Sequence, residues 1–212
     1  MLERNAALIT SRAGCLIRVT KVATRTPKPD LCGQVAQTGS DPLAITSDPE
    51  VDVVVETMGG YDVAFEVIKR ALSNGKHVVT ANKALIAERG NELFALASAN
   101  EVTLAFESAV AGGIPIIKAL REGLAANDIE WLAGIINGTG NFILSEMSAK
   151  QSEFSEVLQQ AQGMGYAEAD PTFDVEGIDA AHKLTIMSAI AFGIPLQFEK
   201  TYTEGIGGIS PA

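Results

Sequence analysis

Lys183 ends a stretch of sequence in which several carboxylates precede an otherwise apolar helix. Before this lysine, the stretch AQGMGYAEADPTFDVEGIDAAHK carries Glu168, Asp170, Asp174 and Asp179. The helix expected over about 177–191 is apolar on nearly every side after Lys183, and such a helix is normally buried. A buried lysine needs a partner, and Asp179 lies one helical turn earlier, at i,i+4. Two interpretations stay open: a structural ion pair, or an ammonium in a dry pocket that polarises or protonates an oxygen.

The composition is that of an ordinary globular protein. The 212 residues are 47% hydrophobic and 20% charged, enough for one large or two small domains. A net charge of −10 without a Lys/Arg cluster argues against nucleic-acid and anionic-membrane partners, because both need a concentrated basic surface. Cys15 and Cys32 form neither a disulfide framework nor a zinc spacing, and no segment reaches the length of a membrane span. We therefore expect a soluble, cytoplasmic protein.

The first half of the sequence alternates strand-like and helix-like patterns. Short β-branched or apolar runs, typical of buried strands, are separated by segments with the apolar period of helices. This βαβ order favours a parallel sheet with helices packed on its faces. The expected helices are 2–12, 61–73 and 83–99, and the expected strands are 16–23, 51–56, 76–80 and 102–106.

The pattern changes after Gly112, where we place a domain boundary. The expected helices beyond it are 115–124, 139–149, 153–162 and 177–191, and the expected strand is 129–136. The sequence therefore predicts an α/β fold in which a parallel-sheet domain over 1–112 is followed by an α+β domain over 113–212.

Loops at the carboxyl ends of parallel strands are where such sheets bind ligands. The loop 56–60 contains Thr57 and two glycines, so its backbone N–H groups could approach a cofactor, or it is an ordinary turn. In the loop 80–83, Asn82 is a good N-cap and Lys83 stands in the first helical turn, where a cation opposes the helix dipole. Lys83 is therefore either aimed at a cofactor or substrate carboxylate, or is a solvated lysine.

Two further loops contain small residues with accessible backbone groups. The loop 107–114 could offer carbonyl oxygens to a hard cation, or it is a domain hinge. The segment 137–141 ends a predicted strand and opens a helix, so it suits a small carboxylate or is a capped turn. His77 and His182 have no metal-binding spacing, and we expect both to be structural or solvated.

Taken together, these blocks resemble homoserine dehydrogenase. In the family's order, the chain has VVVETMGG, VVTANKAL, ESAVAGGIPII and NGTGNFIL, followed at the family's spacing by Ala161, Gly165, Tyr166, Ala167, Asp170, Pro171, Asp174, Val175, Gly177, Asp179 and Lys183. The resemblance implies a reversible NAD(P)-dependent interconversion of L-aspartate 4-semialdehyde and L-homoserine, toward threonine and methionine, in a homo-oligomer. It also implies a Rossmann-like nucleotide-binding domain over 1–112 and a substrate-binding, catalytic and dimerisation domain over 113–212.

The resemblance assigns roles to particular residues. Lys183 is expected to donate the proton to the nascent alkoxide, Asp179 to be its polar partner, and Lys83 to lie between nicotinamide and substrate. The substrate site is expected to contain Glu168, which would hold the amine, together with Gly138, Thr139, Tyr166 and Asp174. The cofactor site is expected to contain Thr57, Lys83 and Arg25, the last of which favours NADP over NAD. Backbone oxygens of a sodium site are expected from Glu107, Val110, Gly112 and Ile114.

The sequence departs from the family at both ends. The family opens with a strand, a G-x-G-x-x-G loop and a helix, whereas Met1 begins within that helix, and the chain stops at Ala212 where the family continues. We expect a fragment or a misplaced start site, without the pyrophosphate-binding loop and a central strand, so that both domains are incomplete. A second hypothesis is a non-catalytic remnant that acts as an oligomerisation or small-molecule-binding module. Against it, the chain keeps Lys183, Asp179, Glu168 and Lys83 together.

Overall fold

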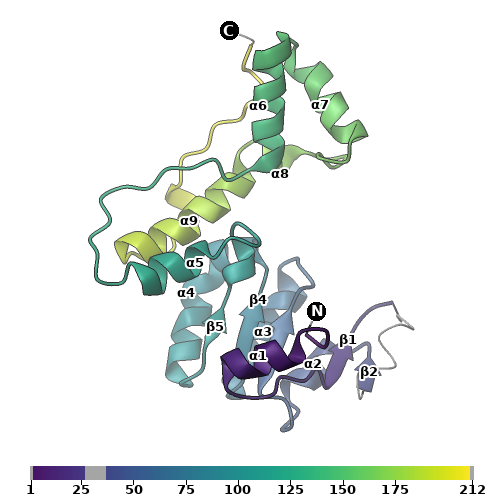
Figure 1. Ribbon diagram of the computed structural model, residues 1–212, viewed down its shortest axis with the longest axis vertical. Helices are drawn as coiled ribbons and strands as arrows, with labels where there is room; N and C mark the ends of the chain where they lie inside the picture. Colours follow the sequence, from purple (N-terminus) through teal and green to yellow (C-terminus); the bar gives the residue numbers. More distant parts are fainter. Residues whose placement is uncertain (1, 27–36, 211–212) are drawn as a thin grey trace.

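The computed structural model describes residues 2–26 and 37–210 and confirms the α/β fold class (Figure 1). Parallel strands lie in one half of the molecule, and helices α6, α7 and α8 gather at the opposite end (Figure 1). Cys15 is exposed and unpaired, whereas Cys32 lies outside the described residues. Within the described ranges, no helix is long and apolar enough to cross a membrane.

A β-α-β-α-β unit forms the centre of the first half. Its three strands pair in parallel in the order β3-β4-β5, and the register places Val54 beside Val78 and Val78 beside Leu104. The side chains of all three residues are buried, because helices α3 and α4 pack against the sheet. The elements are β3 (Val53–Glu56), α3 (Asp62–Ser73), β4 (His77–Thr80), α4 (Lys83–Ala99) and β5 (Leu104–Ala105).

Helix α3 shows how the sequence positions these elements. Its apolar residues recur at helical spacing and turn one face to the core, where Phe65, Val67 and Ile68 are at most 3% exposed. The helix ends at Asn74, and Gly75 follows with a φ of 70°, a conformation that glycine adopts without strain. The tight turn lets β4 begin directly beside β3.

The expected strand 16–23 is wrong over most of its length. Only β1 (Lys21–Ala23) pairs, in parallel with β2 (Gln37–Gly39), and Leu16, Ile17 and Val19 are exposed. A strand extends only as far as its neighbour offers hydrogen-bonding groups, and β2 is three residues long. The remaining early elements are α1 (Ala6–Ala13) and α2 (Pro42–Thr46).

The expected strand 129–136 is also wrong. These residues form neither helix nor strand, and Trp131 and Ile135 are 74% and 80% exposed. Among the described residues no strand lies beyond β5, so the β-branched residues of this segment have no ladder to join. A pattern of alternating apolar residues is therefore not sufficient to form a strand when no neighbouring strand is available to pair with it.

In the described part of the second half, helices are the only regular secondary structure. Helix α9 packs on α4 and on the π-helical turn η3, which joins it to the core of the first half. A second, smaller core contains Ile143, Met147, Val157, Ala161, Ala167 and Val175. The elements are α5 (Ile116–Lys118), η3 (Ala119–Gly123), α6 (Gly138–Lys150), α7 (Phe154–Gly163), α8 (Thr172–Val175), α9 (Ile178–Phe192) and the 3-10 turn η4 (Phe198–Lys200).

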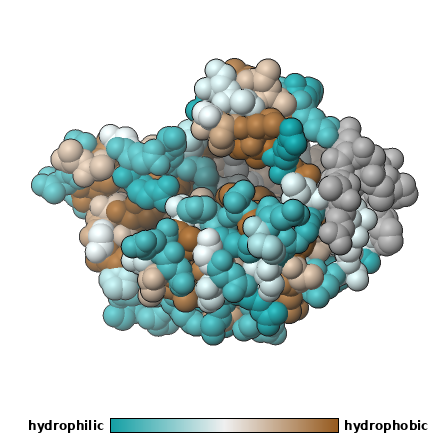
Figure 2. All heavy atoms as spheres, turned by 90° about the horizontal axis from the view of Figure 1, so that it is seen from below, coloured by the Kyte–Doolittle hydropathy of each residue, from teal (hydrophilic) through white to brown (hydrophobic). Residues whose placement is uncertain are grey.

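Hydrophobic residues also reach the surface. On the face seen in Figure 2, brown hydrophobic patches are interspersed with hydrophilic residues. On β3 the alternation of side chains buries Val54 and leaves Val53 and Val55 47% and 64% exposed. One face of this strand is therefore covered by helices and the other is open.

Val67 and Val63 provide a matched test of this packing, because both lie on α3 but are 3% and 59% exposed. We expect Val67→Ala to lower the free energy of unfolding by about 2 kcal/mol, because it removes buried methyl groups and leaves a cavity. Val63→Ala should change it by less than about 0.5 kcal/mol. Chemical denaturation followed by circular dichroism measures both, and equal losses would contradict the packing described for α3.

Candidate active site

Lys183 and Asp179 form the ion pair that the sequence predicts. Both lie on α9, and Nζ of Lys183 is 2.6 Å from Oδ2 of Asp179. The same ammonium donates a hydrogen bond to the backbone carbonyl of Ile136 at 2.7 Å. The side chains of the lysine and the acid are 17% and 9% exposed. The pair is therefore largely shielded from water without being sealed from it.

Lys83 joins this pair from the other half of the chain. It is the first residue of α4, and its Nζ lies 3.0 Å from Oδ1 of Asp179. Asn82 fixes the start of the helix, because its side-chain oxygen accepts a hydrogen bond from the backbone N–H of Leu85 at 3.2 Å. One carboxylate thus bonds two amines, one on each of its oxygens. Lys83 is therefore ion-paired, although its side chain remains 34% exposed.

Asn137 is a member of the cluster that the sequence does not single out. Its amide nitrogen donates to Asp179 at 2.9 Å and to Asp174 at 2.7 Å, and its oxygen accepts from the backbone N–H of Gly140 at 2.6 Å. The amide thereby caps α6 and holds two carboxylates together. The sequence signal was an asparagine at an N-cap position, which predicts the cap but not the carboxylates beyond it.

The surroundings of Asp179 favour its charged form. Burial alone would raise the pKa of this carboxyl, but hydrogen bonds from Lys183, Asn137 and Lys83 outweigh burial and lower its pKa below 3.8. The carboxylate therefore stays ionised across the physiological range. It can hold both ammonium groups without itself exchanging a proton.

His182 lies beside this cluster and is 1% exposed. Its ring packs between those of Phe173 and Phe198, and Nε2 is 3.3 Å from Oε1 of Glu88, which accepts a hydrogen bond from the Tyr61 hydroxyl. Neither ring nitrogen makes a hydrogen bond of good geometry. Burial and the Glu88 carboxylate raise the pKa of Tyr61 to about 12. His182 is buried among aromatic rings, so the solvated alternative expected from the sequence is wrong for it.

The expected substrate residues divide into two groups. Asp174 belongs to the cluster through Asn137, and Gly138 opens α6 directly after that residue. The hydroxyl of Thr139 donates to the backbone carbonyl of Tyr166 at 2.9 Å, so these two residues lie together at the helix start. Glu168 is exposed, and among the described residues its carboxylate makes no hydrogen bond or ion pair.

The expected cofactor residues lie at the carboxyl ends of strands. Arg25 is exposed just beyond β1, in a turn where the Thr24 hydroxyl donates to the Thr26 carbonyl at 3.0 Å. Thr57 is exposed directly after β3. Two backbone N–H groups of this loop, however, are already bonded to the side chain of Glu56. They are turned inward, so a cofactor could meet only the outer side of the loop.

The loop 107–114 lies at the end of β5, and Glu107 forms part of η2 (Glu107–Ala109). The carboxylate of Glu107 accepts hydrogen bonds from the backbone N–H groups of Ile117 and Lys118. The carbonyls of Glu107 and Ile114 each accept a backbone hydrogen bond, whereas within the described ranges those of Val110 and Gly112 accept none. In the described ranges no group of three or more His, Cys, Asp and Glu side chains could hold a metal ion.

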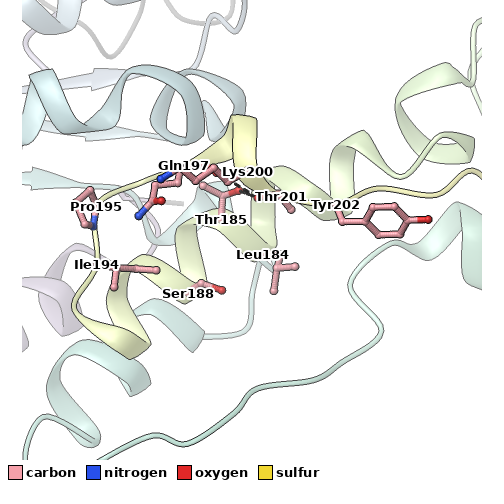
Figure 3. A pocket seen from close by; sticks show the side chains of 9 residues that line it. All are labelled: Leu184, Thr185, Ser188, Ile194, Pro195, Gln197, Lys200, Thr201 and Tyr202. Carbon is pink, nitrogen blue, oxygen red and sulfur yellow. Dashed lines mark hydrogen bonds between the residues drawn. The ribbon is translucent and has the colours of Figure 1, made fainter.

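A pocket of about 330 Å³ opens elsewhere on α9 (Figure 3). Helix residues Leu184, Thr185 and Ser188 form one wall, and the segment 194–202 forms the other. It contains none of the residues of the amine and carboxylate cluster. The pocket is therefore separate from the candidate active site.

Comparison with known proteins identifies the family to which this chain belongs. Residues 115–212 match the family model described as homoserine dehydrogenase, and residues 3–107 match the model of its NAD binding domain. The chain belongs to the homoserine dehydrogenase family. A homoserine dehydrogenase of Pseudomonas aeruginosa is 62% identical over 212 residues, which are 100% of this chain and 49% of that protein. One of Neisseria gonorrhoeae is 55% identical over 97% of this chain and 48% of its own length.

Solved structures of homoserine dehydrogenases share the fold. That of Thiobacillus denitrificans is 61% identical with a TM-score of 0.92, over 99% of this chain and 49% of that chain. A hyperthermophilic archaeal homoserine dehydrogenase, solved in complex with NADPH, is 32% identical with a TM-score of 0.72, over 81% of this chain and 52% of its own. The chain thus contains an NAD-binding domain of oxidoreductases, and it spans about half the length of the relatives that it matches.

In this member of the homoserine dehydrogenase family, Asp179 should make stability sensitive to acid. Its folded-state pKa lies below the unfolded value of 3.8, so its stabilisation is present above pH 3.8 and is lost as the pH falls through the folded-state pKa. We expect Asp179→Asn to remove this acid-dependent loss. Melting temperatures between pH 6 and pH 2.5 measure it. Glu153→Gln, at an exposed position without a side-chain cap bond, should keep the wild-type pH dependence.

His182 should make the stability of the fold depend on pH over a higher range than Asp179 does. Burial lowers its pKa from 6.5, the Lys83 ammonium acts in the same direction, and Glu88 and Asp179 oppose both. The unfolded chain therefore binds a proton below pH 6.5 that the folded protein binds less readily, so stability falls as the pH drops below 6.5. We expect His182→Gln to lack this component between pH 7 and pH 5, and His77→Gln, at an exposed position, to retain it. Identical profiles for the two variants would contradict this assignment.

Proposed function

We propose that this chain carries the amine and carboxylate centre with which homoserine dehydrogenase interconverts L-homoserine and L-aspartate 4-semialdehyde. The observation that carries the proposal is the Asp179 carboxylate, which bonds the ammonium groups of Lys183 and Lys83 at 2.6 and 3.0 Å. Removing Asp179 and Lys183 largely from water is unfavourable, and clusters of partly buried charges are typical of functional sites. The family membership of the chain gives the cluster its reaction.

Lys183 is the proposed acid and base of this reaction. In aldehyde reduction, the ammonium donates a proton to the oxygen that becomes an alkoxide when hydride reaches the aldehyde carbon. In alcohol oxidation, the neutral amine takes the hydroxyl proton. An ammonium has three N–H donors, and those of Lys183 to Asp179 and Ile136 occupy two of them. The third is left for the substrate oxygen.

Asp179 and Lys83 prepare this proton transfer. The carboxylate and the Ile136 carbonyl fix the direction of the Lys183 amine, which reduces the entropy lost when the substrate arrives. Lys83, 34% exposed, stays accessible to a negatively charged group of a ligand while it remains bonded to Asp179. We assign it a place between the nicotinamide and the substrate.

The remaining substrate contacts are proposals that follow the family resemblance. Glu168 is assigned the substrate amine, in keeping with its exposed carboxylate. The assignment of Asp174 to the substrate site is supported by its link to Asp179 through Asn137. Gly138, Thr139 and Tyr166 are supported by their position at the start of α6 and beside it.

The cofactor site is proposed at the carboxyl ends of β1, β3 and β4. Arg25, Thr57 and Lys83 stand at these ends in the described structure, which fits a bound dinucleotide. When bound, the dinucleotide supplies or accepts the hydride. The guanidinium of Arg25 favours NADP, because it could pair with a 2′-phosphate. We also propose the domain boundary at 112/113, in keeping with family matches that end at 107 and begin at 115.

The sodium site fits the structure less well. Carbonyls of Glu107 and Ile114 already accept hydrogen bonds from the backbone N–H groups of Val110 and Ile116. A carbonyl has a second lone pair, so a cation held by these two and by Val110 and Gly112 stays a proposal. No step of the reaction is assigned to it.

The oligomeric state, the cellular location and the pathway are proposed from the family membership of the chain. A homo-oligomer in the cytoplasm, acting on a small molecule on the way to threonine and methionine, agrees with the acidic charge of −10 and with the absence of a spanning helix in the described ranges. The activity belongs to the whole protein, since the chain spans about half the length of its relatives.

Lys183→Gln tests the proposed acid. In the protein expressed from the full reading frame that contains this sequence, we expect kcat to fall by about 10²–10⁴-fold, because general acid catalysis is lost. NADPH oxidation with aspartate 4-semialdehyde measures the rate. Lys150→Gln, on α6 with a lysine side chain 52% exposed, is the matched control and should keep wild-type kcat.

Two results would contradict the proposal. Wild-type turnover by Lys183→Gln would remove this residue from the chemistry. A folded wild-type protein that binds dinucleotide or substrate without turnover would instead favour the non-catalytic binding module.

A further inference from the structure

Glu56 is a buried carboxylate for which the reaction has no direct use. It is the last residue of β3 and is 2% exposed. No ion pair involves it among the described residues, so its polar partners are hydrogen-bond donors alone. Burying an ionised carboxyl without a cation is costly unless donors surround it. Burial of Glu56 at the carboxyl edge of the sheet therefore indicates a specific role for its side chain.

Three donors converge on this carboxylate. Oε1 accepts the backbone N–H groups of Met58 at 2.6 Å and Gly59 at 3.1 Å, and Oε2 accepts the hydroxyl of Thr80 at 2.6 Å. Two of the donors belong to the loop after β3, and the third ends β4. All three bonds end on the two oxygens of this one carboxyl group. Glu56 thus connects the ends of two neighbouring strands.

The connection continues to the start of α4. The Thr80 oxygen accepts the backbone N–H of Asn82 at 3.0 Å, and the Asn82 side chain donates to the carbonyl of Gly60 at 2.6 Å. The same side chain caps α4, whose first residue is Lys83. The hydrogen bonds therefore form a closed ring from Glu56 through Thr80 and Asn82 to Gly60 and back through the loop.

We propose that Glu56 is a positioning residue that holds the loop 57–60 and the N-terminus of α4 in one fixed arrangement for the bound dinucleotide and for Lys83. The proposal rests on the proposed function, because it assigns the dinucleotide to the outer side of this loop. The outward side is open: beside Gly59 and Gly60, which have φ of 71° and 74°, no described atom beyond the adjacent residues lies within 4 Å of the position of an added Cβ. The buried carboxylate fixes the inner side of the loop and leaves this outer side free.

Two isosteric substitutions test the link without changing the size of a side chain. Glu56→Gln keeps the length but replaces one acceptor by a donor, and Thr80→Val removes the hydroxyl that joins Glu56 to Asn82. We expect each to lower kcat/KM in the full-reading-frame protein by about tenfold or more, through a higher KM for NADPH and a lower kcat, since misplaced groups react more slowly. Thr80→Ser, which keeps the hydroxyl, should restore values within about twofold of wild type.

Thr46 provides the matched control for loss of a buried hydroxyl. Like Thr80 it is 0% exposed, and its hydroxyl donates to the Leu43 carbonyl within α2. Thr46→Val should lower the melting temperature to a similar extent without changing kcat or the KM for NADPH. The double variant Glu56→Gln/Thr80→Val should be no worse than the poorer single variant, because both break the same connection.

Amide hydrogen exchange distinguishes failure of this proposal from failure of the proposed function. In Glu56→Gln we expect faster exchange in peptides that cover 57–60, and this readout does not depend on turnover. If wild type is inactive with aspartate 4-semialdehyde but the loop exchange still responds, the function is wrong and the positioning role stands. If Glu56→Gln and Thr80→Val match Thr46→Val in kcat and KM, Glu56 is merely structural and the proposal is overturned.

Discussion

The carboxylate of Asp179 bonds amines delivered by α9 and by α4, so the packing of these two helices decides whether the site exists. Lys183 is positioned locally, one turn along the same helix. Lys83 is positioned through the parallel sheet, because α4 starts where β4 ends. The apolar contacts between α9 and α4 therefore act directly on the distance between two charged groups. The packing of α9 on α4 therefore also determines the geometry of the candidate active site.

Burial of the Asp179 and Glu56 carboxyl groups is tolerated because each has specified hydrogen-bond donors. Asp179 has three donors, from Lys183, Lys83 and Asn137, and these keep it ionised at 6% exposure. Glu56 is held by three donors without a cation. The two carboxylates differ in what they hold: the first holds three side chains, and the second holds two backbone N–H groups and the Thr80 hydroxyl. Together they specify the position of Lys83 from both of its ends.

The sequence predicted those features that depend on neighbours along the chain. The i,i+4 spacing predicted the Lys183 and Asp179 pair, and apolar periodicity predicted α3, α4 and α9 within a few residues. The contact of Lys83 with Asp179 spans the two halves, so no local pattern shows it. The same holds for Asn137, whose N-cap role was visible and whose carboxylate partners were not. The strand predicted at 129–136 fails for a related reason, since a strand requires a neighbour that local sequence does not specify.

Sharing one anion makes the two lysines thermodynamically dependent on each other. A negatively charged ligand that draws Lys83 away leaves Asp179 to interact more strongly with Lys183, and the reverse also holds. The free energy of the contact between Asp179 and one lysine therefore depends on whether the contact with the other lysine is present. The amines at the start of α4 and on α9 are thus electrostatically coupled through one carboxylate.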